Sequence, residues 1–551
     1  MKEITIRIKL NRENMQMKEE DTFLKDVEVS RTLTCRAGEN LLELLRRERL
    51  APEAPCGGNG TCGKCRVKIC NASGEREALA CRTTIGSDML VRIAESRPPE
   101  EICSSSESEW QKRRADSLQI SGTRWGAAVD LGTTTVAAAF YPLAETMEDP
   151  EDGSEEGVIP SAPFSTCSEW NCQIPYGADV ITRIQYCMEH KEGLEELASA
   201  IRDQTAHMLA ETISAAGERE LPQPQRIVIS GNTVMQHIFA GINPSPIARA
   251  PFVPTSLFAE GIPHYFPEFK DTKVFFLPCI SGYVGGDITA GLLHTGLIKQ
   301  EKLTLFLDIG TNGEMAIGNR DGLLCCSTAC GPAFEGAQIS CGMRALTGAI
   351  NHVRLRGRTL LTETIGGGRP AGLCGSGLID LLAILLQEGI VDETGRLPGP
   401  AEGPHKWRHR LREDENGNGI FTVYADARGK VEFTAADVRK LQLAKAAVAA
   451  GVKTLLKRSG HAEEEVDRVL IAGSFGAHID PLSMGRIGML APSLAGKLVP
   501  CGNTSLEGAA ELLQNPGKMQ EAQNISKKAA YLELPGDSDF AELFIDEMMF
   551  E

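Results

Sequence analysis

The sequence predicts a multidomain α/β protein, in which a small β-grasp domain precedes a larger, duplicated two-lobed domain. The chain has 551 residues, which is beyond the size at which a single hydrophobic core stops growing. A group of closely spaced cysteines and glycines lies in the first hundred residues, and one strand–turn–strand pattern occurs twice in the remainder. We therefore expect a first domain at 1–96, a linker at 97–123, and two lobes at 124–300 and 301–551.

The composition argues against nucleic-acid and membrane partners. The formal net charge is −17, and a chain of that charge is repelled by a phosphate backbone. Nowhere do 18 apolar residues run together, and the residues after Met1 alternate charged with apolar side chains instead of forming a signal-peptide core. We expect a cytoplasmic protein, whose 17 cysteines are reduced thiols or metal ligands.

The first elements of the chain indicate the β-grasp domain. Apolar and polar residues alternate from 4 to 10, which is the period of a half-buried strand, and 24–33 supplies a second strand. After Gly38, the leucines of 40–50 form one apolar helical face, and basic residues lie toward its carboxyl end, where the helix dipole favours them. Two strands and a crossing helix suggest a small β-grasp fold.

A cysteine cluster follows this predicted helix. Cys56, Cys62 and Cys65 have the spacing C-x5-C-x2-C, and four glycines lie between them. Iron–sulfur clusters are held by cysteine thiolates, and glycines let backbone N–H groups turn toward the negatively charged sulfurs. Cys81 is the best fourth ligand. Cys70 is its rival, but it comes only five residues after Cys65, at the end of an apparent strand.

Two other interpretations of these cysteines stay open. One is a structural zinc site, although such sites usually pair two C-x2-C units and this segment has one; the other is a set of unligated thiols. The spacing resembles that of vertebrate-type and bacterial 2Fe-2S ferredoxins. Only 15 residues separate Cys65 from Cys81, so a hairpin or helix of ordinary ferredoxins is missing.

Two polar segments are expected to connect folded parts. The stretch 97–124 opens with a Pro pair and is typical of a domain connector, which a moving electron carrier would need as a tether. The stretch 145–157 is strongly acidic and is most simply a solvated loop between strands.

The repeated pattern occupies 125–140 and 303–318. Each copy is a buried strand that ends in Asp-x-Gly-Thr, followed by a tight turn and a second apolar strand. Such a hairpin presents backbone N–H groups and Thr hydroxyls to phosphate oxygens, while its Asp faces Mg2+ or the waters bound to it. Two copies that head two halves of one domain resemble the actin, Hsp70 and sugar-kinase ATPase superfamily, so an actin-like ATPase fold is expected.

Further segments follow the order of that superfamily. Strand-then-helix patterns occur at 226–241 and 274–292, and a strong helix pattern at 441–460. In 466–480 a buried strand delivers Gly473 and Ser474 to a helix start, where a nucleotide's adenosine can approach the backbone closely.

The whole chain resembles one specific family. A C-x5-C-x2-C ferredoxin joined to this ATPase, with the motifs at 330–345, 372–383 and 501–513, looks like the reductive activators of corrinoid-dependent methyl transfer. The resemblance implies restoration of cob(II)alamin to cob(I)alamin on a corrinoid protein, with ATP hydrolysis and an upstream electron donor. It also implies a possible homodimer.

The resemblance assigns roles to the hairpin residues. Asp130 and Asp308 would be Mg2+-water ligands, and Asp287 would position the attacking water, although it could equally be a helix N-cap. Glu335 is a further carboxylate candidate that could also be an ordinary loop residue. The phosphate and adenosine contacts would come from Gly132, Thr133, Thr134, Gly310, Thr311, Asn312, Gly473 and Ser474.

Three other functions stay open on the sequence. Sugar and acid kinases share the ATPase fold, but a kinase does not explain a fused ferredoxin. A second is an electron-carrying module whose nucleotide domain acts only as a switch for docking, which ATP turnover would distinguish. A third is an activator of a non-corrinoid redox enzyme, which would resemble the dehydratase activators; these share the ATPase but hold a 4Fe-4S cluster between subunits, so iron counting and spectra would decide.

Overall fold

The computed structural model describes most of the chain. The described residues are 3–11, 29–48, 50–54, 56–60, 62–71, 74–94, 124–143, 161–215, 223–336, 338–357, 359–476 and 478–550. The connector expected at 97–123 and the acidic loop expected at 145–157 lie outside them. No helix of these described parts is long and apolar enough to cross a membrane.

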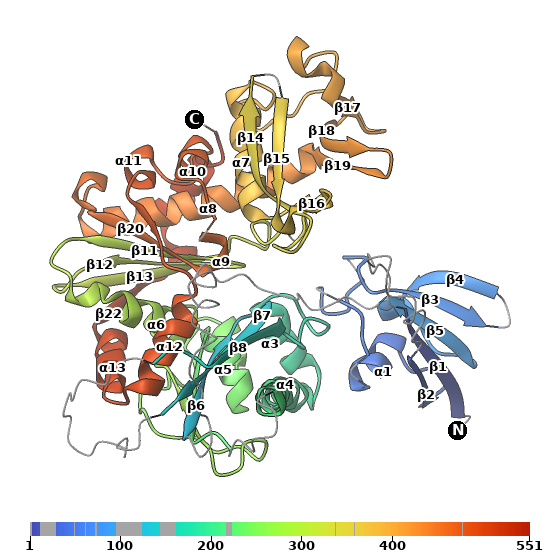
Figure 1. The fold of residues 1–551 in the computed structure, drawn as a ribbon, viewed down its shortest axis with the longest axis vertical. Coiled ribbons are helices and arrows are strands. Elements are labelled where there is room, and N and C mark those ends of the chain that lie inside the picture. Colours follow the sequence, from blue (N-terminus) through green and yellow to red (C-terminus); the bar gives the residue numbers. More distant parts are fainter. Residues whose placement is uncertain are drawn as a thin grey trace.

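The N-terminal domain has the expected β-grasp fold, drawn in blue in Figure 1. Its five-stranded sheet has the order β2-β1-β5-β3-β4, with β1 and β5 parallel. Helix α1 covers the sheet, and its leucines are fully buried because they share the face predicted from their spacing. The elements are β1 (Glu3–Asn11), β2 (Val29–Arg36), α1 (Leu41–Arg47), β3 (Arg66–Asn71), β4 (Gly74–Leu79) and β5 (Met89–Ala94).

The two large sheets repeat one topology, as the duplicated pattern predicts. In each sheet an antiparallel three-stranded meander is followed by two parallel strands on its other side. The lobe I sheet has the order β10-β9-β6-β7-β8, and the lobe II sheet has the order β21-β20-β11-β12-β13-β22. Their first strands are almost entirely buried, because helices cover both faces of each sheet.

The elements of lobe I are β6 (Trp125–Leu131), β7 (Thr135–Pro142), β8 (Ser165–Trp170), α3 (Val180–Glu189), α4 (Gly193–Ala215), β9 (Arg226–Gly231), α5 (Thr233–Ala240), β10 (Lys273–Phe276) and α6 (Gly286–Thr295). The sheet strands of lobe II are β11 (Thr304–Ile309), β12 (Gly313–Gly318), β13 (Leu323–Thr328), β20 (Arg468–Ala472), β21 (Leu498–Pro500) and β22 (Ala529–Leu532).

Three helices lie between the two sheets (Figure 1). Helix α6 packs against α12 (Thr504–Gln514) and α13 (Lys518–Lys528), and α12 also contacts strands β6 and β9. The core around these helices contains Val228 from lobe I together with Phe306 and Leu470 from lobe II. The two lobes therefore share one apolar layer, although α12 lies more than 200 residues after α6.

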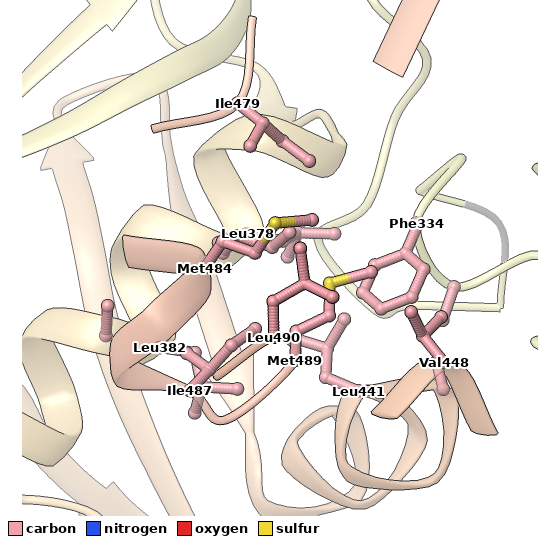
Figure 2. Close-up of a cluster of buried hydrophobic side chains, with 14 of the residues drawn as sticks. Phe334, Leu378, Leu382, Leu441, Val448, Ile479, Met484, Ile487, Met489 and Leu490 are labelled. Carbon is pink, nitrogen blue, oxygen red and sulfur yellow. The ribbon is translucent and has the colours of Figure 1, made fainter. Parts of the chain in front are cut away.

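A large insertion separates β13 from β20 and carries two small sheets. Helix α8 begins with a capping box formed by Thr434 and Asp437, and Gly460 ends it in the left-handed conformation. Figure 2 shows side chains of α7, α8 and α10 meeting in the core beneath this insertion. The elements are β14 (Ala349–Arg356), β15 (Thr359–Thr364), β16 (Gly372–Leu373), α7 (Gly375–Gln387), β17 (Leu411–Glu413), β18 (Gly419–Asp426), β19 (Gly429–Thr434) and α8 (Ala435–Ser459). Four more helices follow β20, namely α9 (Gly473–Gly476), α10 (Pro481–Arg486), α11 (Pro492–Ala495) and α14 (Ser538–Asp546).

Candidate functional site

Four thiols of the N-terminal domain meet as two pairs. The Cys62 thiol donates to the sulfur of Cys56, and the Cys65 thiol donates to that of Cys81, with an S–S separation of 3.3 Å in each pair. Asn40, the N-cap of α1, donates to the Cys81 carbonyl and ties the second pair to the helix. Cys70 lies on β3 opposite Glu75 and belongs to neither pair.

This arrangement fits a 2Fe-2S cluster, which takes two thiolates on each iron. Burial raises the pKa of Cys81 to about 12, and the neighbouring Cys65 thiol adds to the shift, so ionising the group requires nearby positive charge of the kind that iron supplies. The intervening glycines all have positive φ, which turns the loop around the sulfurs. A side chain at Gly60 would come within 2.3 Å of Arg82 Nε, so the loop is also closely packed.

The first predicted phosphate hairpin joins β6 to β7 and is held from outside by polar side chains. Asn171 donates from Nδ2 to the Gly132 carbonyl at 2.8 Å, and its backbone N–H donates to the Thr134 carbonyl at 3.0 Å. The Thr133 hydroxyl accepts from Asn232 Nδ2 at 3.1 Å, and the Thr133 carbonyl accepts from the buried guanidinium of Arg183. The carbonyl oxygens of Gly132, Thr133 and Thr134 thus accept hydrogen bonds from outside the hairpin. An anion would be bound by the other polar groups of the hairpin, its backbone N–H groups and hydroxyls.

Four carboxylates near the two hairpins influence one another, namely Asp130, Asp287, Asp308 and Glu314. Burial, followed by the nearby Asp130 charge, raises the pKa of Asp308 to about 7. Burial also raises the pKa of Asp287 to about 8, with Asp308 as the next cause. The pKa of Glu314, which pairs with Asp308 across β11 and β12, is likewise raised by burial. Ionising several neighbouring carboxylates is unfavourable without a compensating positive charge. A hard divalent cation supplies that charge and prefers oxygen ligands.

Asp130 has partners that sequence reasoning missed. Its carboxylate accepts from Ser505 Oγ at 2.7 Å and from Asn503 Nδ2 at 3.0 Å. Asn503 is also the N-cap of α12, and Ser505 Oγ lies 2.9 Å from Ser230 Oγ. The motif at 501–513 was a signal of the family, but its spacing did not indicate that it meets the first hairpin.

Two of the remaining predicted residues, Gly473 and Asp287, lie near Asp308. Gly473 begins α9 at φ +82°, donates to the Gly502 carbonyl, and would bring an added Cβ within 3.3 Å of Asp308 Oδ1. Ser474 follows it, although its side chain lies outside the described residues. The N-cap of α6 is Gly285, so the alternative role of Asp287 as an N-cap is wrong, and Asp287 lies in the first turn.

One loop of lobe I contacts both the first hairpin and the N-terminal domain. Asn171 begins this loop, and four residues later the Pro175 carbonyl accepts from Arg46 Nε and Nη2 at 3.0 and 2.6 Å. The Arg46 guanidinium also lies 5.3 Å from the ring centroid of Tyr176 and 5.2 Å from that of Tyr186. Helix α1, whose N-cap Asn40 contacts Cys81, and the first hairpin therefore both contact one short segment of lobe I.

Family comparisons match three consecutive parts of the chain. Residues 24–86 match the 2Fe-2S iron-sulfur cluster binding domain, 125–300 match the RACo middle region, and 302–551 match the C-terminal domain of RACo, the ASKHA domain. Together these matches show a 2Fe-2S domain followed by an ATP-binding actin-like fold, as the sequence predicts.

Curated relatives and a solved structure agree with these matches. The chain is 34% identical over 435 residues to the corrinoid activation enzyme RamQ of Eubacterium limosum, covering 77% of this chain and 70% of that protein. It is 26% identical over 367 residues to a reductase of a methylated amine-specific Co(II) corrinoid protein from Methanosarcina barkeri, covering 60% of this chain and 64% of that protein.

A structure described as a reductive activator for corrinoid, iron-sulfur protein is 28% identical, with a TM-score of 0.67, and the match covers 99% of this chain and 98% of that one. The sequence match to RamQ spans more than two thirds of that enzyme, and the structural match extends over both the ferredoxin and ATPase domains. This chain therefore belongs to the RACo family of corrinoid reductive activators.

Proposed function

We propose that this protein uses ATP to return an inactive corrinoid protein from cob(II)alamin to cob(I)alamin. Cys56, Cys62, Cys65 and Cys81 would hold the 2Fe-2S cluster. When bound, the cluster would supply the one electron that converts Co(II) to Co(I), and an upstream electron donor would replace that electron. The observation that carries this proposal is the loop from Asn171 to Tyr176, because it contacts the predicted phosphate hairpin and the ferredoxin domain together.

The proposed nucleotide site lies between the two hairpins. Asp130 and Asp308 would hold Mg2+ through bound waters, and Asp287 would orient the attacking water. The phosphates would meet the backbone and hydroxyls of the two hairpins, and Gly473 and Ser474 would meet the adenosine. The buried carboxylate group supports a cation there, since ionised Asp287 and Asp308 need a compensating charge.

ATP has a thermodynamic purpose in this reaction. Moving one electron to an acceptor whose reduction potential is 100 mV more negative costs about 2.3 kcal/mol. Plant-type 2Fe-2S clusters have reduction potentials of about −400 mV. Nucleotide-dependent closure of the lobes can drive binding to the corrinoid protein and bias its metal coordination. Hydrolysis then sets the direction of transfer without a change in the potential of the cluster.

The test is an anaerobic mixture of the protein, a cob(II)alamin-loaded corrinoid protein, a reductant and MgATP, observed by absorbance. Cob(I)alamin should accumulate only when all components are present. ATP consumption should require the corrinoid protein, and a small alcohol should not replace it. Reduction at the same rate and extent without ATP would contradict the proposal. We also propose a cytoplasmic location, where thiols stay reduced, and a homodimer, which sedimentation would detect.

A further inference from the structure

Glu335 joins the two predicted phosphate hairpins through a single carboxylate. Its Oε2 accepts from the Thr134 hydroxyl at 2.9 Å, and its Oε1 accepts from the Thr311 hydroxyl at 2.7 Å. Thr134 belongs to the hairpin of lobe I and Thr311 to that of lobe II. One side chain therefore bridges the lobes at the position where both hairpins present their hydroxyls.

The turn that carries Glu335 is held firmly in lobe II. The preceding Phe334 is 2% exposed and points into the apolar cluster near Leu441 and Val448 (Figure 2). The following Gly336 has φ +75°, and a Cβ there would lie 2.4 Å from the Met343 carbonyl oxygen. The carboxylate is thus placed by a buried side chain on one side and a closely packed glycine on the other.

Two further contacts make the bridge specific. An added Cβ at Gly310 would come within 3.4 Å of Glu335 Oε1, so the second hairpin leaves space for this carboxylate. Arg344, in the same loop, interacts electrostatically with Glu335 and places its guanidinium carbon 3.3 Å from the centroid of the Trp170 ring in lobe I. The loop of lobe II therefore reaches across to lobe I at a second point.

A carboxylate that accepts from two hydroxyls has the hydrogen-bonding character of a phosphate oxygen pair. The Glu335 carboxylate and a bound phosphate are both anions that need the same two hydroxyl donors. Two anions that approach the same donors repel each other strongly in a partly buried site. Bound phosphate and Glu335 consequently cannot use the Thr134 and Thr311 hydroxyls at the same time.

We propose that Glu335 is a phosphate-competing bridge: it holds the two hairpins together in the nucleotide-free protein and yields their hydroxyls to the phosphates of ATP. This inference rests on the proposed nucleotide site. Glu335 would be a positioning residue that weakens ATP binding. Removing its side chain should therefore increase the affinity for ATP instead of lowering it.

The test compares MgATP affinity by calorimetry in the wild-type protein and in Glu335→Ala, Glu335→Gln and Glu402→Ala. Glu402 is a surface glutamate of the lobe II insertion and serves as the matched control. Glu335→Ala should bind MgATP at least about tenfold more tightly, because it removes both charge-assisted contacts that compete with the phosphates. Glu335→Gln keeps the shape but loses the charge, so its affinity should fall between those of Glu335→Ala and the wild type, and Glu402→Ala should match the wild type.

Small-angle scattering gives a second readout on the same proteins. Without nucleotide, Glu335→Ala should show more widely separated lobes than the wild type, and MgATP should remove the difference. Unchanged or weaker MgATP binding in the folded Glu335→Ala variant would overturn the inference. So would a Glu335→Gln variant whose ATP turnover falls by orders of magnitude at unchanged affinity, because that result identifies a catalytic base. If the wild type itself bound no MgATP, the proposed nucleotide site would fail first.

Discussion

The guanidinium of Arg46 in the ferredoxin domain donates two hydrogen bonds to the carbonyl oxygen of Pro175 in lobe I. The side chain is almost entirely buried, and its cationic face lies against the rings of Tyr176 and Tyr186. This contact fixes the ferredoxin domain against the ATPase at a loop that also holds the first hairpin.

Arg46→Met should release the ferredoxin domain from lobe I. The variant loses two charged hydrogen bonds and the cation–π contacts, which are each worth about 1–3 kcal/mol when desolvated. Limited proteolysis should cleave between the domains faster, and scattering should show a larger radius of gyration. Arg47→Ala is the control, because that neighbouring side chain is exposed and pairs with Glu39 inside the ferredoxin domain. Equal proteolysis of both variants and the wild type would show that Arg46 does not hold the domains together.

Cys81→Ser should abolish the visible spectrum of the 2Fe-2S cluster, whereas Cys70→Ser should leave it intact. The reason is positional, since the Cys81 sulfur lies 3.3 Å from that of Cys65 and Cys70 lies on β3 outside both pairs. Iron content and visible absorbance of the anaerobically purified variants provide the measurement. A cluster that survives loss of Cys81 but not of Cys70 would reverse the assignment of the fourth ligand.

The metal-free, nucleotide-free protein should lose stability as the pH rises toward 8. Burial raises the pKa of Asp308 to about 7, whereas an Asp in the unfolded chain has a pKa of about 3.9. Between these two pH values the folded chain therefore binds more protons than the unfolded chain. By linkage, the contribution of Asp308 to the free energy of unfolding falls as pH rises through that interval and levels off above about 7.

Asp308→Asn removes this contribution and should raise the melting temperature at pH 8 by a few degrees, with a smaller effect near pH 5 and little effect below about pH 4. Thermal melts across that pH range, with and without MgATP, supply the measurement. In the wild type MgATP should flatten the profile, because the cation favours the ionised carboxylates. The shift expected for Asp287, whose pKa is raised to about 8, means that some pH dependence should persist in the variant. A wild-type melting temperature that rises with pH would contradict the expectation.

Asp308→Ala should separate electron supply from electron delivery. ATP turnover should fall by orders of magnitude, because one of the carboxylates proposed to hold Mg2+ is gone when transition-state charge develops. The cluster should still form and accept an electron from a chemical reductant at the wild-type rate. Net cob(I)alamin should not accumulate. Reduction of the corrinoid protein at the wild-type rate and extent would make ATP regulatory and would favour the docking-switch alternative.

Local patterns carried much of the fold. The alternation at 4–10 predicts a strand, and β1 (Glu3–Asn11) is found there. The leucine face of α1 and the two Asp-x-Gly-Thr hairpins also lie within a few residues each, so their hydrophobic period reports directly which side chains are buried. The carboxyl end of the second strand was less accurate, since it was expected at 33 and β2 continues to Arg36; the expected residues 24–28 lie outside the described residues.

Short-range patterns were enough to predict the order of domains, the cluster cysteines, the duplicated hairpins and the family. The folded structure was needed to show which distant residues meet. Ser505 contacts Asp130, Glu335 contacts Thr134, and Arg46 contacts Pro175, pairs that lie 375, 201 and 129 residues apart. Periodicity records whether a side chain is buried, but it does not record its partner. Distant residues meet only when the two sheets pack against the helices between them. That arrangement is stable because of packing over the whole chain, which a local pattern does not contain.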